Sequence, residues 1–213
     1  MNRRESGVDA PRGRPEDTQL LFPQFVKAVA AGDDDDAEAL CQQLTAADEP
    51  KLIGLIADAD LDMRWWALRA LAQCGTAQSV AAIAVVLAAP QPELRQVATL
   101  TLGHIFQSAP ERVSRQLPTL ATLLRDEDGM VRQAAMMALS MCGDDAVAVL
   151  AEILAGSHQG ARTRAAQALR RIGSMGAAAV LYRHLEDPNH LVRTHAYEAL
   201  DEMGLLENIL VTL

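Results

Sequence analysis

Residues 64–75 read RWWALRALAQCG, residues 132–143 read RQAAMMALSMCG and residues 193–204 read RTHAYEALDEMG. Each stretch starts with arginine and has alanine three and six residues later, leucine at the seventh position and glycine at the eleventh. Apolar residues at such spacings share one face of an α-helix. The pattern recurs in full or in part from five arginines: Arg64, Arg95, Arg132, Arg162 and Arg193.

A second apolar pair precedes every recurring arginine. Leucine or isoleucine stands twelve and eight residues before it, one turn apart on a helix face. Short turns rich in Asp, Pro, Gly or Asn separate the two apolar segments. These positions are Leu52 and Ile56, Ile83 and Leu87, Leu120 and Leu124, Leu150 and Leu154, and Leu181 and Leu185. The sequence therefore predicts helical pairs that repeat about every 30 residues.

A weaker copy lies upstream. If Asp33 takes the place of the arginine, Leu21 and Phe25 occupy the first-helix positions, and Ala39 and Leu40 occupy the second. Terminal repeats of solenoids are atypical because their outer face meets water. We therefore predict six helical pairs, the first of which acts as a cap.

These repeats resemble the HEAT-repeat superfamily, in particular the short bacterial variety found in phycobilisome chromophore lyases. The resemblance covers about residues 18–204 and implies an all-α fold, a right-handed α-α superhelix. It also implies that the second helices line the concave side and that turn aspartates form a buried ladder with the recurring arginines. Asp58, Asp126 and Asp187 stand six residues before three of these arginines.

The predicted organisation is a disordered tail over residues 1–16 followed by a single domain over residues 17–213. The basic, Pro- and Gly-rich start of the chain has no apolar segment of the kind found in secretory signals. The last nine residues, 205–213, are mostly apolar; they either fold back as a cap or pack on another subunit. The predicted units are the cap pair 17–46 and the repeats 47–75, 76–109, 113–143, 144–173 and 174–204.

The composition of the chain disfavours several classes of function. The 213 residues carry a formal net charge of −9, which disfavours nucleic acid because its binding requires Lys and Arg to neutralise phosphates. No apolar stretch approaches the roughly 20 residues that span a bilayer. Three widely spaced cysteines favour a reducing, cytoplasmic setting.

The first, fifth and eighth positions after each arginine point away from the predicted core, at about 100° per residue. In the first three repeats they include large apolar residues, which indicates a binding surface. The alternative is that superhelical twist or the terminal cap covers them. The predicted partner-binding groove consists of Trp65, Arg69, Gln96, Leu100, Gln133, Met137, Gln167 and Arg170.

Catalytic and metal-binding patterns are weak. No histidine is followed by glutamate, so the His-Glu pairs of di-iron HEAT-repeat enzymes such as deoxyhypusine hydroxylase are missing. The acidic run Asp33–Asp36 favours a helix cap over a cation site. Cys74 and Cys142 fall on core positions, where a thiol is a small buried hydrophobe. The basic cluster Arg162, Arg164, Arg170 and Arg171 favours a charge patch over a DNA track.

The sequence therefore predicts a non-catalytic module, a monomer or homodimer without cofactors, that binds another protein in its groove. The resemblance leaves a second hypothesis, a chromophore-lyase-like or chaperone-like protein that acts on a bilin or a bilin-bearing subunit. A nucleic-acid-binding protein is the third hypothesis, and the acidic balance opposes it.

Overall fold

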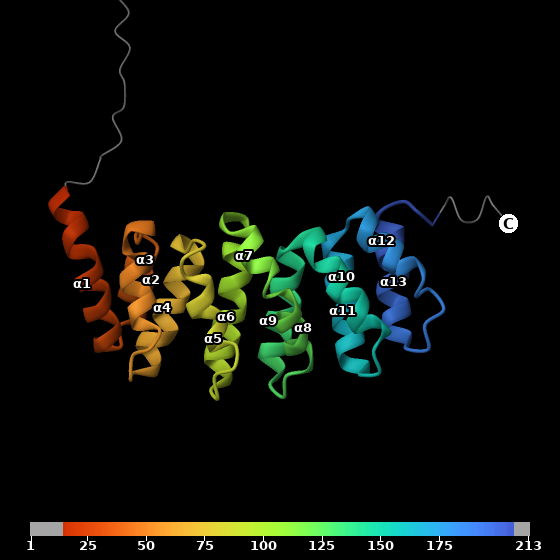
Figure 1. Ribbon diagram of the computed structural model, residues 1–213, viewed down its shortest axis with the longest axis horizontal. Helices are drawn as coiled ribbons and strands as arrows, with labels where there is room; N and C mark the ends of the chain where they lie inside the picture. The colour runs from red at the N-terminus through yellow and green to blue at the C-terminus, as the bar shows by residue number, and fades with distance from the viewer. Residues whose placement is uncertain (1–14, 207–213) are drawn as a thin grey trace, which may run out of the picture.

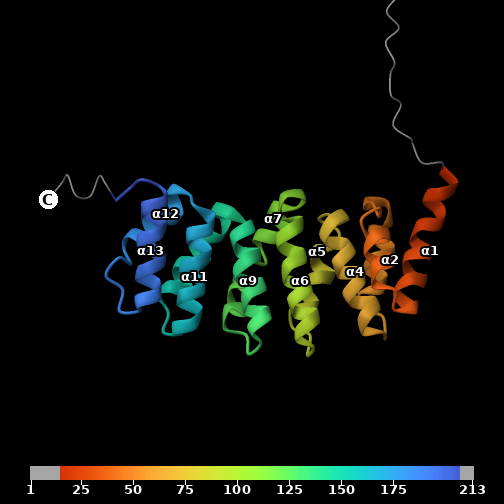
Figure 2. The ribbon, with the colours of Figure 1, turned by 180° about the vertical axis from the view of Figure 1, so that it is seen from behind.

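The computed structural model describes residues 15–206, and the part described is entirely helical apart from turns. Figures 1 and 2 show helical pairs that follow one another in chain order, from α1 at one end to α13 at the other. This arrangement confirms the predicted all-α solenoid. Most of the predicted tails 1–16 and 205–213 lies outside the described residues.

Six helical pairs make up this row. They are α1 (Pro15–Ala31) and α2 (Asp34–Cys41), α3 (Glu49–Leu55) and α4 (Leu61–Cys74), α5 (Val80–Val86) and α6 (Pro92–His104), α8 (Leu117–Thr122) and α9 (Gly129–Met141), α10 (Val147–Ala155) and α11 (Gln159–Ile172), and α12 (Met175–Tyr182) and α13 (His190–Glu202). A short 3₁₀ turn, Ile105–Ser108, and helix α7 (Pro110–Ser114) stand between the third and fourth pairs. This insertion explains why Arg95 and Arg132 are farther apart than the other recurring arginines.

The second helices pack in series, α4 on α6, α6 on α9, α9 on α11 and α11 on α13. The alanines at the third and sixth positions after the arginines are buried, so neighbouring backbones approach closely. One close approach lies between α6 and α9, where a Cβ atom on Gly103 would meet the Ala138 Cα at 2.8 Å. Gly103 stands eight residues after Arg95, a position predicted to point away from the core; this prediction was wrong, because Gly103 is buried in a helix contact.

The first helices bury the predicted leucines and isoleucines against this stack. Leu52, Ile83, Leu120 and Leu150 are each 0% exposed, whereas Leu185 near the C-terminal end is half-buried. These side chains and the buried alanines form one continuous core along the row. Because each pair completes its core only against its neighbours, the pairs stabilise one another.

The capping residue of each second helix fixes the register of its repeat. In five pairs it stands four residues before the recurring arginine: Asp60, Gln91, Asp128, His158 and Asn189. Asp33 caps α2 in the same way, because its carboxylate accepts the Asp36 N–H at 3.1 Å. This bond confirms that the acidic run begins a helix.

The predicted register of the cap pair was nevertheless wrong by four residues. Since Asp33 is the capping residue, Ala37 takes the place of the arginine, and Phe25 and Val29 take the two first-helix positions. Phe25, Val29 and Ala37 are buried, whereas the predicted core residue Ala39 is exposed. The usual period of about 30 residues points to Asp33, but the cap pair lies closer to its neighbour along the chain, with Ala37 only 27 residues before Arg64.

The recurring arginines hold the end of the first helix in their own repeat. The Arg64 and Arg162 Nε atoms each donate to a carbonyl oxygen eight residues earlier, at 2.9 Å. Arg132 and Arg193 donate to the carbonyl oxygens of Asp126 and Asp187, at 2.8 and 2.6 Å. Such bonds satisfy carbonyl groups that a helix end or turn would otherwise leave unpaired.

The implied Asp–Arg ladder has two rungs in the described residues. The Arg95 guanidinium donates two hydrogen bonds, of 2.9 and 2.7 Å, to the Asp126 carboxylate of the next repeat. Arg162 pairs with Asp187 between later repeats. Asp58 has no such partner because the preceding repeat carries Ala37 at the arginine position; its carboxylate accepts the Asp60 N–H instead. Burial would raise the pKa of Asp126, but the bonds from Arg95 and Asp128 outweigh it and lower that pKa.

Replacement of Arg95 by methionine should leave the Asp126 carboxylate buried without its cation. Removal of one partner of a buried ion pair costs about 3–5 kcal/mol. Arg64→Met is the matched control, because Arg64 holds a carbonyl oxygen but no carboxylate. Urea unfolding should show a clearly larger loss for Arg95→Met, and equal losses would contradict a stabilising role for the rung.

The glycines at the ends of four second helices play two different roles. Gly143, Gly173 and Gly204 have φ angles of 58°, 62° and 67°, the left-handed conformation expected of them. Gly75 does not, since its φ is −69°. A Cβ atom there would lie 2.5 Å from the Leu71 carbonyl oxygen and 3.1 Å from Ile105 Cγ2. Space, rather than backbone conformation, therefore requires glycine at this position.

Gly75→Ala should destabilise the protein by about 1–3 kcal/mol, the usual cost of overpacking a tight site. Gly54→Ala is the control, because Gly54 lies inside α3 with nothing within 4 Å of its Cβ position. That change should stabilise the protein by about 0.5–1 kcal/mol, through helix propensity alone. Thermal unfolding of both variants compares their stabilities with that of the unchanged protein. A Gly75→Ala variant as stable as the unchanged protein would contradict the need for glycine at this position.

Candidate functional site

The predicted groove residues lie along the second helices, and all of them are at least partly exposed. Trp65 and Arg69 come from α4, Leu100 from α6 and Met137 from α9. The Met137 and Trp65 side chains also rest against the core, which holds them in place. Gln96, Gln133, Gln167 and Arg170 complete the set.

A hollow of about 410 Å³ lies between α4 and α6. Arg69, Gln73, Leu100 and His104 line it, so the structure brings two predicted groove residues together. The Arg69 guanidinium donates to Glu38 of α2 at 2.5 Å, which neutralises its charge within the chain. What the hollow offers a partner is therefore largely apolar and amide surface.

A larger hollow of about 740 Å³ lies where α2, α4 and α6 begin, and we refer to it as the tryptophan pocket. The rings of Trp65 and Trp66 meet edge to face in it, with centroids 5.1 Å apart. Its other lining residues include Asp34, Asp62, Gln91 and Glu93. Of these lining residues only Trp65 belongs to the predicted groove. The acidic ones give no distinct signal in the sequence, because an acidic residue after a helix cap is expected from the helix dipole alone.

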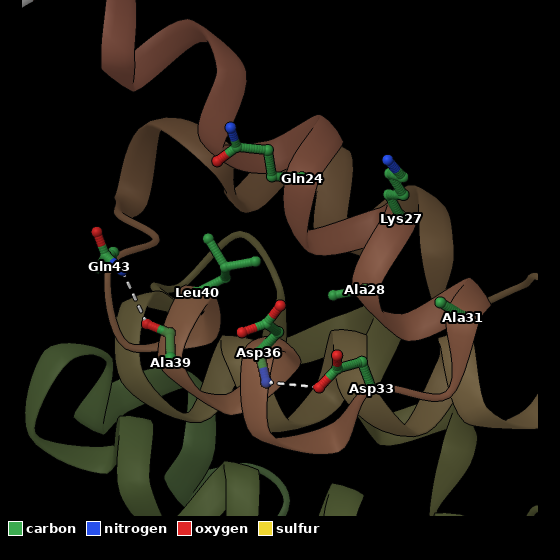
Figure 3. A pocket seen from close by; sticks show the side chains of 9 residues that line it. All are labelled: Gln24, Lys27, Ala28, Ala31, Asp33, Asp36, Ala39, Leu40 and Gln43. Carbon is green, nitrogen blue, oxygen red and sulfur yellow. Dashed lines mark hydrogen bonds between the residues drawn. The ribbon is translucent and has the colours of Figure 1, made fainter.

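A third hollow, of about 530 Å³, lies between α1 and α2 (Figure 3). Figure 3 shows Gln24 and Lys27 on the α1 side, with Asp33, Asp36 and Leu40 on the α2 side. The Asp33 carboxylate is occupied by the helix cap, and the Lys27 side chain points outward. No predicted groove residue lines this hollow, so it is separate from the candidate site.

The C-terminal half of the predicted groove is occupied by internal ion pairs. Arg170 of α11 pairs with Glu198 and Glu202 of α13. Arg162 pairs with Asp187. Burial, and to a smaller extent the positive charge of the nearby Arg132, lowers the pKa of Arg164. Two of the four arginines of the predicted basic cluster, Arg162 and Arg170, are therefore paired with carboxylates inside the chain.

The cysteines are poor nucleophiles. Cys41 and Cys142 are buried, and burial raises their thiol pKa to about 11 and about 12. Cys74 is half-buried, not fully buried as predicted, and burial raises its pKa to about 11 as well. Thiols with such pKa values stay protonated at neutral pH.

Histidine, cysteine and carboxylate side chains do not gather into a metal-type cluster in residues 15–206. His195 approaches Glu198 at 3.7 Å, and burial lowers the pKa of this histidine. Nor does any helix of this described segment have the length and apolarity to cross a membrane.

Comparison with known families agrees with the repeat geometry. The family model for HEAT repeats matches residues 86–170 and 147–209, which together exceed half of the chain. The chain belongs to the HEAT-repeat family. The model for the PBS lyase HEAT-like repeat also matches, over residues 63–88. None of the curated proteins matches the sequence.

Several solved structures are similar to this chain at low sequence identity. One is the complex of CpcE and CpcF of phycocyanin lyase from Nostoc sp. PCC7120, with 20% identity, a TM-score of 0.58 and coverage of 70% of this chain and 98% of that chain. Another is a designed armadillo repeat protein in complex with the peptide (KR)4, with 18% identity, a TM-score of 0.48 and coverage of 84% and 98%. Human deoxyhypusine hydroxylase is 21% identical with a TM-score of 0.31, over 88% and 90%.

Proposed function

We propose that this protein is a non-catalytic interaction module that holds a segment of a partner protein along α4, α6 and α9. The proposed unit is the single domain 17–213. The observation that carries the proposal is the pair of hollows that follow one another along α4 and α6. They are lined by Trp65, Arg69 and Leu100, three residues of the predicted groove.

The chemistry of this surface suits protein recognition. Tryptophan is a preferred hot-spot residue, and methionine adapts to partners of different shape. Trp65, Leu100 and Met137 each keep part of their apolar surface in contact with water. A partner that covers this surface gains about 25 cal/mol for each Å² of apolar area removed from water.

Trp65→Asp, Leu100→Asp and Met137→Asp should each weaken partner capture at least tenfold, because a carboxylate would be buried in an apolar contact. Affinity purification from the native cell with the full chain as bait identifies the partner, and quantitative pull-down compares the variants. Circular dichroism verifies that each variant remains helical.

Val85→Asp is the matched control. Val85 is 77% exposed and belongs to the first helix α5, so it carries the same change away from the proposed surface. Partner recovery that stays unchanged in all three folded groove variants, or that falls equally in Val85→Asp, would contradict the proposal.

A second candidate function is action on a bilin or a bilin-bearing subunit. Two observations favour it: the match to the PBS lyase HEAT-like repeat and the structural likeness to the phycocyanin lyase complex. If this function holds, phycocyanobilin added to the full chain should shift its absorbance saturably, and Trp65→Asp should weaken the shift. A spectrum identical to that of free bilin would remove this candidate.

A further inference from the structure

The tryptophan pocket carries three carboxylates at its rim: Asp34 of α2, Asp62 of α4 and Glu93 of α6. All three residues are exposed, and no hydrogen bond or ion pair reaches their carboxylates from residues 15–206. Arg69 pairs with Glu38 and Arg170 pairs with Glu198, whereas the three rim carboxylates, like those of Glu152 and Glu186, have no such partner in the described residues. The rim therefore holds negative charge that nothing in the described chain balances.

Helix dipoles account for each of these acidic residues separately, but not for their gathering around one hollow. Each carboxylate lies in the first turn of its helix, where negative charge is favoured. That preference does not require three helices to direct their acids to one hollow, nor two tryptophans to line the same hollow. The combination of aromatic rings with surrounding carboxylates is the usual environment of an organic cation.

The rings themselves are free of any cation in the described chain. The cation–π contact found there joins Lys51 to Phe22, with the Lys51 Nζ 4.9 Å from the ring centroid. No such contact involves Trp65 or Trp66 within residues 15–206. Trp66 is 7% exposed and supports Trp65 edge-on, so the half-buried Trp65 offers a fixed surface to a cation.

Gln91 is a third feature of the tryptophan pocket that favours a ligand. Its Oε1 atom is buried and has no hydrogen-bond donor in the described residues, although the residue lines the tryptophan pocket. A buried acceptor without a donor is unfavourable, so a rotation of the Gln91 side chain that brought this oxygen to a ligand N–H group would be favourable. A bare metal ion offers no donor, and the volume of about 740 Å³ suits a larger organic group.

We propose that the tryptophan pocket receives an arginine side chain of the partner protein. A guanidinium is planar, stacks on indole rings and carries five N–H donors, so it satisfies the rings, the carboxylates and Gln91 together. This assignment rests on the proposed function and specifies its partner as a protein whose docking segment contains arginine.

The two tryptophans of the chain are Trp65 and Trp66, so tryptophan emission reports on the pocket alone. The probe is the peptide acetyl-(Gly-Arg)₃-amide, titrated into the full chain at low ionic strength. The matched peptide replaces each arginine by citrulline, which has the same shape without the charge. We expect a saturable emission change with the arginine peptide and at least tenfold weaker binding with citrulline; equal binding would overturn the proposal.

Two charge-matched double variants separate the pocket from general attraction to an acidic protein. Asp62→Asn/Glu93→Gln removes two rim carboxylates, and Glu152→Gln/Glu186→Gln removes two exposed ones outside the pocket. The rim variant should bind the arginine peptide at least tenfold more weakly, whereas the distant variant should change affinity less than twofold. Similar losses in both would overturn the proposal.

The arginines of the N-terminal segment, Arg3, Arg4, Arg12 and Arg14, are the competing occupant. Their joint replacement by glutamine should leave the emission of the ligand-free protein and the peptide affinity unchanged. If emission shifts and affinity rises tenfold, the pocket belongs to the chain itself and the proposal is overturned. Failure of the peptide alone leaves the proposed function standing, because that function is tested by partner capture with Leu100→Asp and Met137→Asp.

Discussion

The alanines after each recurring arginine allow the backbones of neighbouring second helices to approach closely, because only small side chains lie between them. Ala67, Ala135 and Ala165 are 0% exposed, and Gly103 removes even the Cβ atom where α6 meets Ala138. Where a polar residue enters this contact, it must be satisfied: Thr101 of α6 donates its hydroxyl to the Leu68 carbonyl oxygen of α4 at 2.9 Å. The order of the helices and the continuous core both follow from this close packing.

Close stacking also determines where charge can be placed. In the five pairs after the cap pair, an arginine near the start of the second helix is at least partly buried, so it must find carbonyl oxygens in its own repeat or a carboxylate in the next. Arg95 and Arg162 find both, whereas Arg64 finds the carbonyl oxygen only. The polar ladder is thus interrupted where the turn aspartate of the following repeat is missing, as after Arg64, and where the arginine is missing, as at Ala37.

The same geometry divides the outer face of the second helices into two parts. Toward the C-terminal end, Arg170 pairs with Glu198 and Glu202, so its charge is balanced within the chain. Toward the N-terminal end, Trp65 and Leu100 line hollows, and the acids Asp62 and Glu93 have no cation within residues 15–206. Both proposals therefore concern α4 and α6, where apolar surface and unbalanced charge coincide.

Local periodicity was enough to predict the helical pairs and most of their buried leucines and alanines, because these depend on residues one or two turns apart. The HEAT-repeat fold was implied by the family resemblance of the 30-residue repeat. The sequence also predicted that Asp33 begins a helix, but not the register of the cap pair, which depends on how α1 and α2 meet α4. The need for glycine at Gly75, the burial of Gly103 and the gathering of Asp34, Asp62 and Glu93 around Trp65 were decided by tertiary structure. These features join residues about 30 positions apart in sequence, and only the stacking of repeats brings such residues into contact.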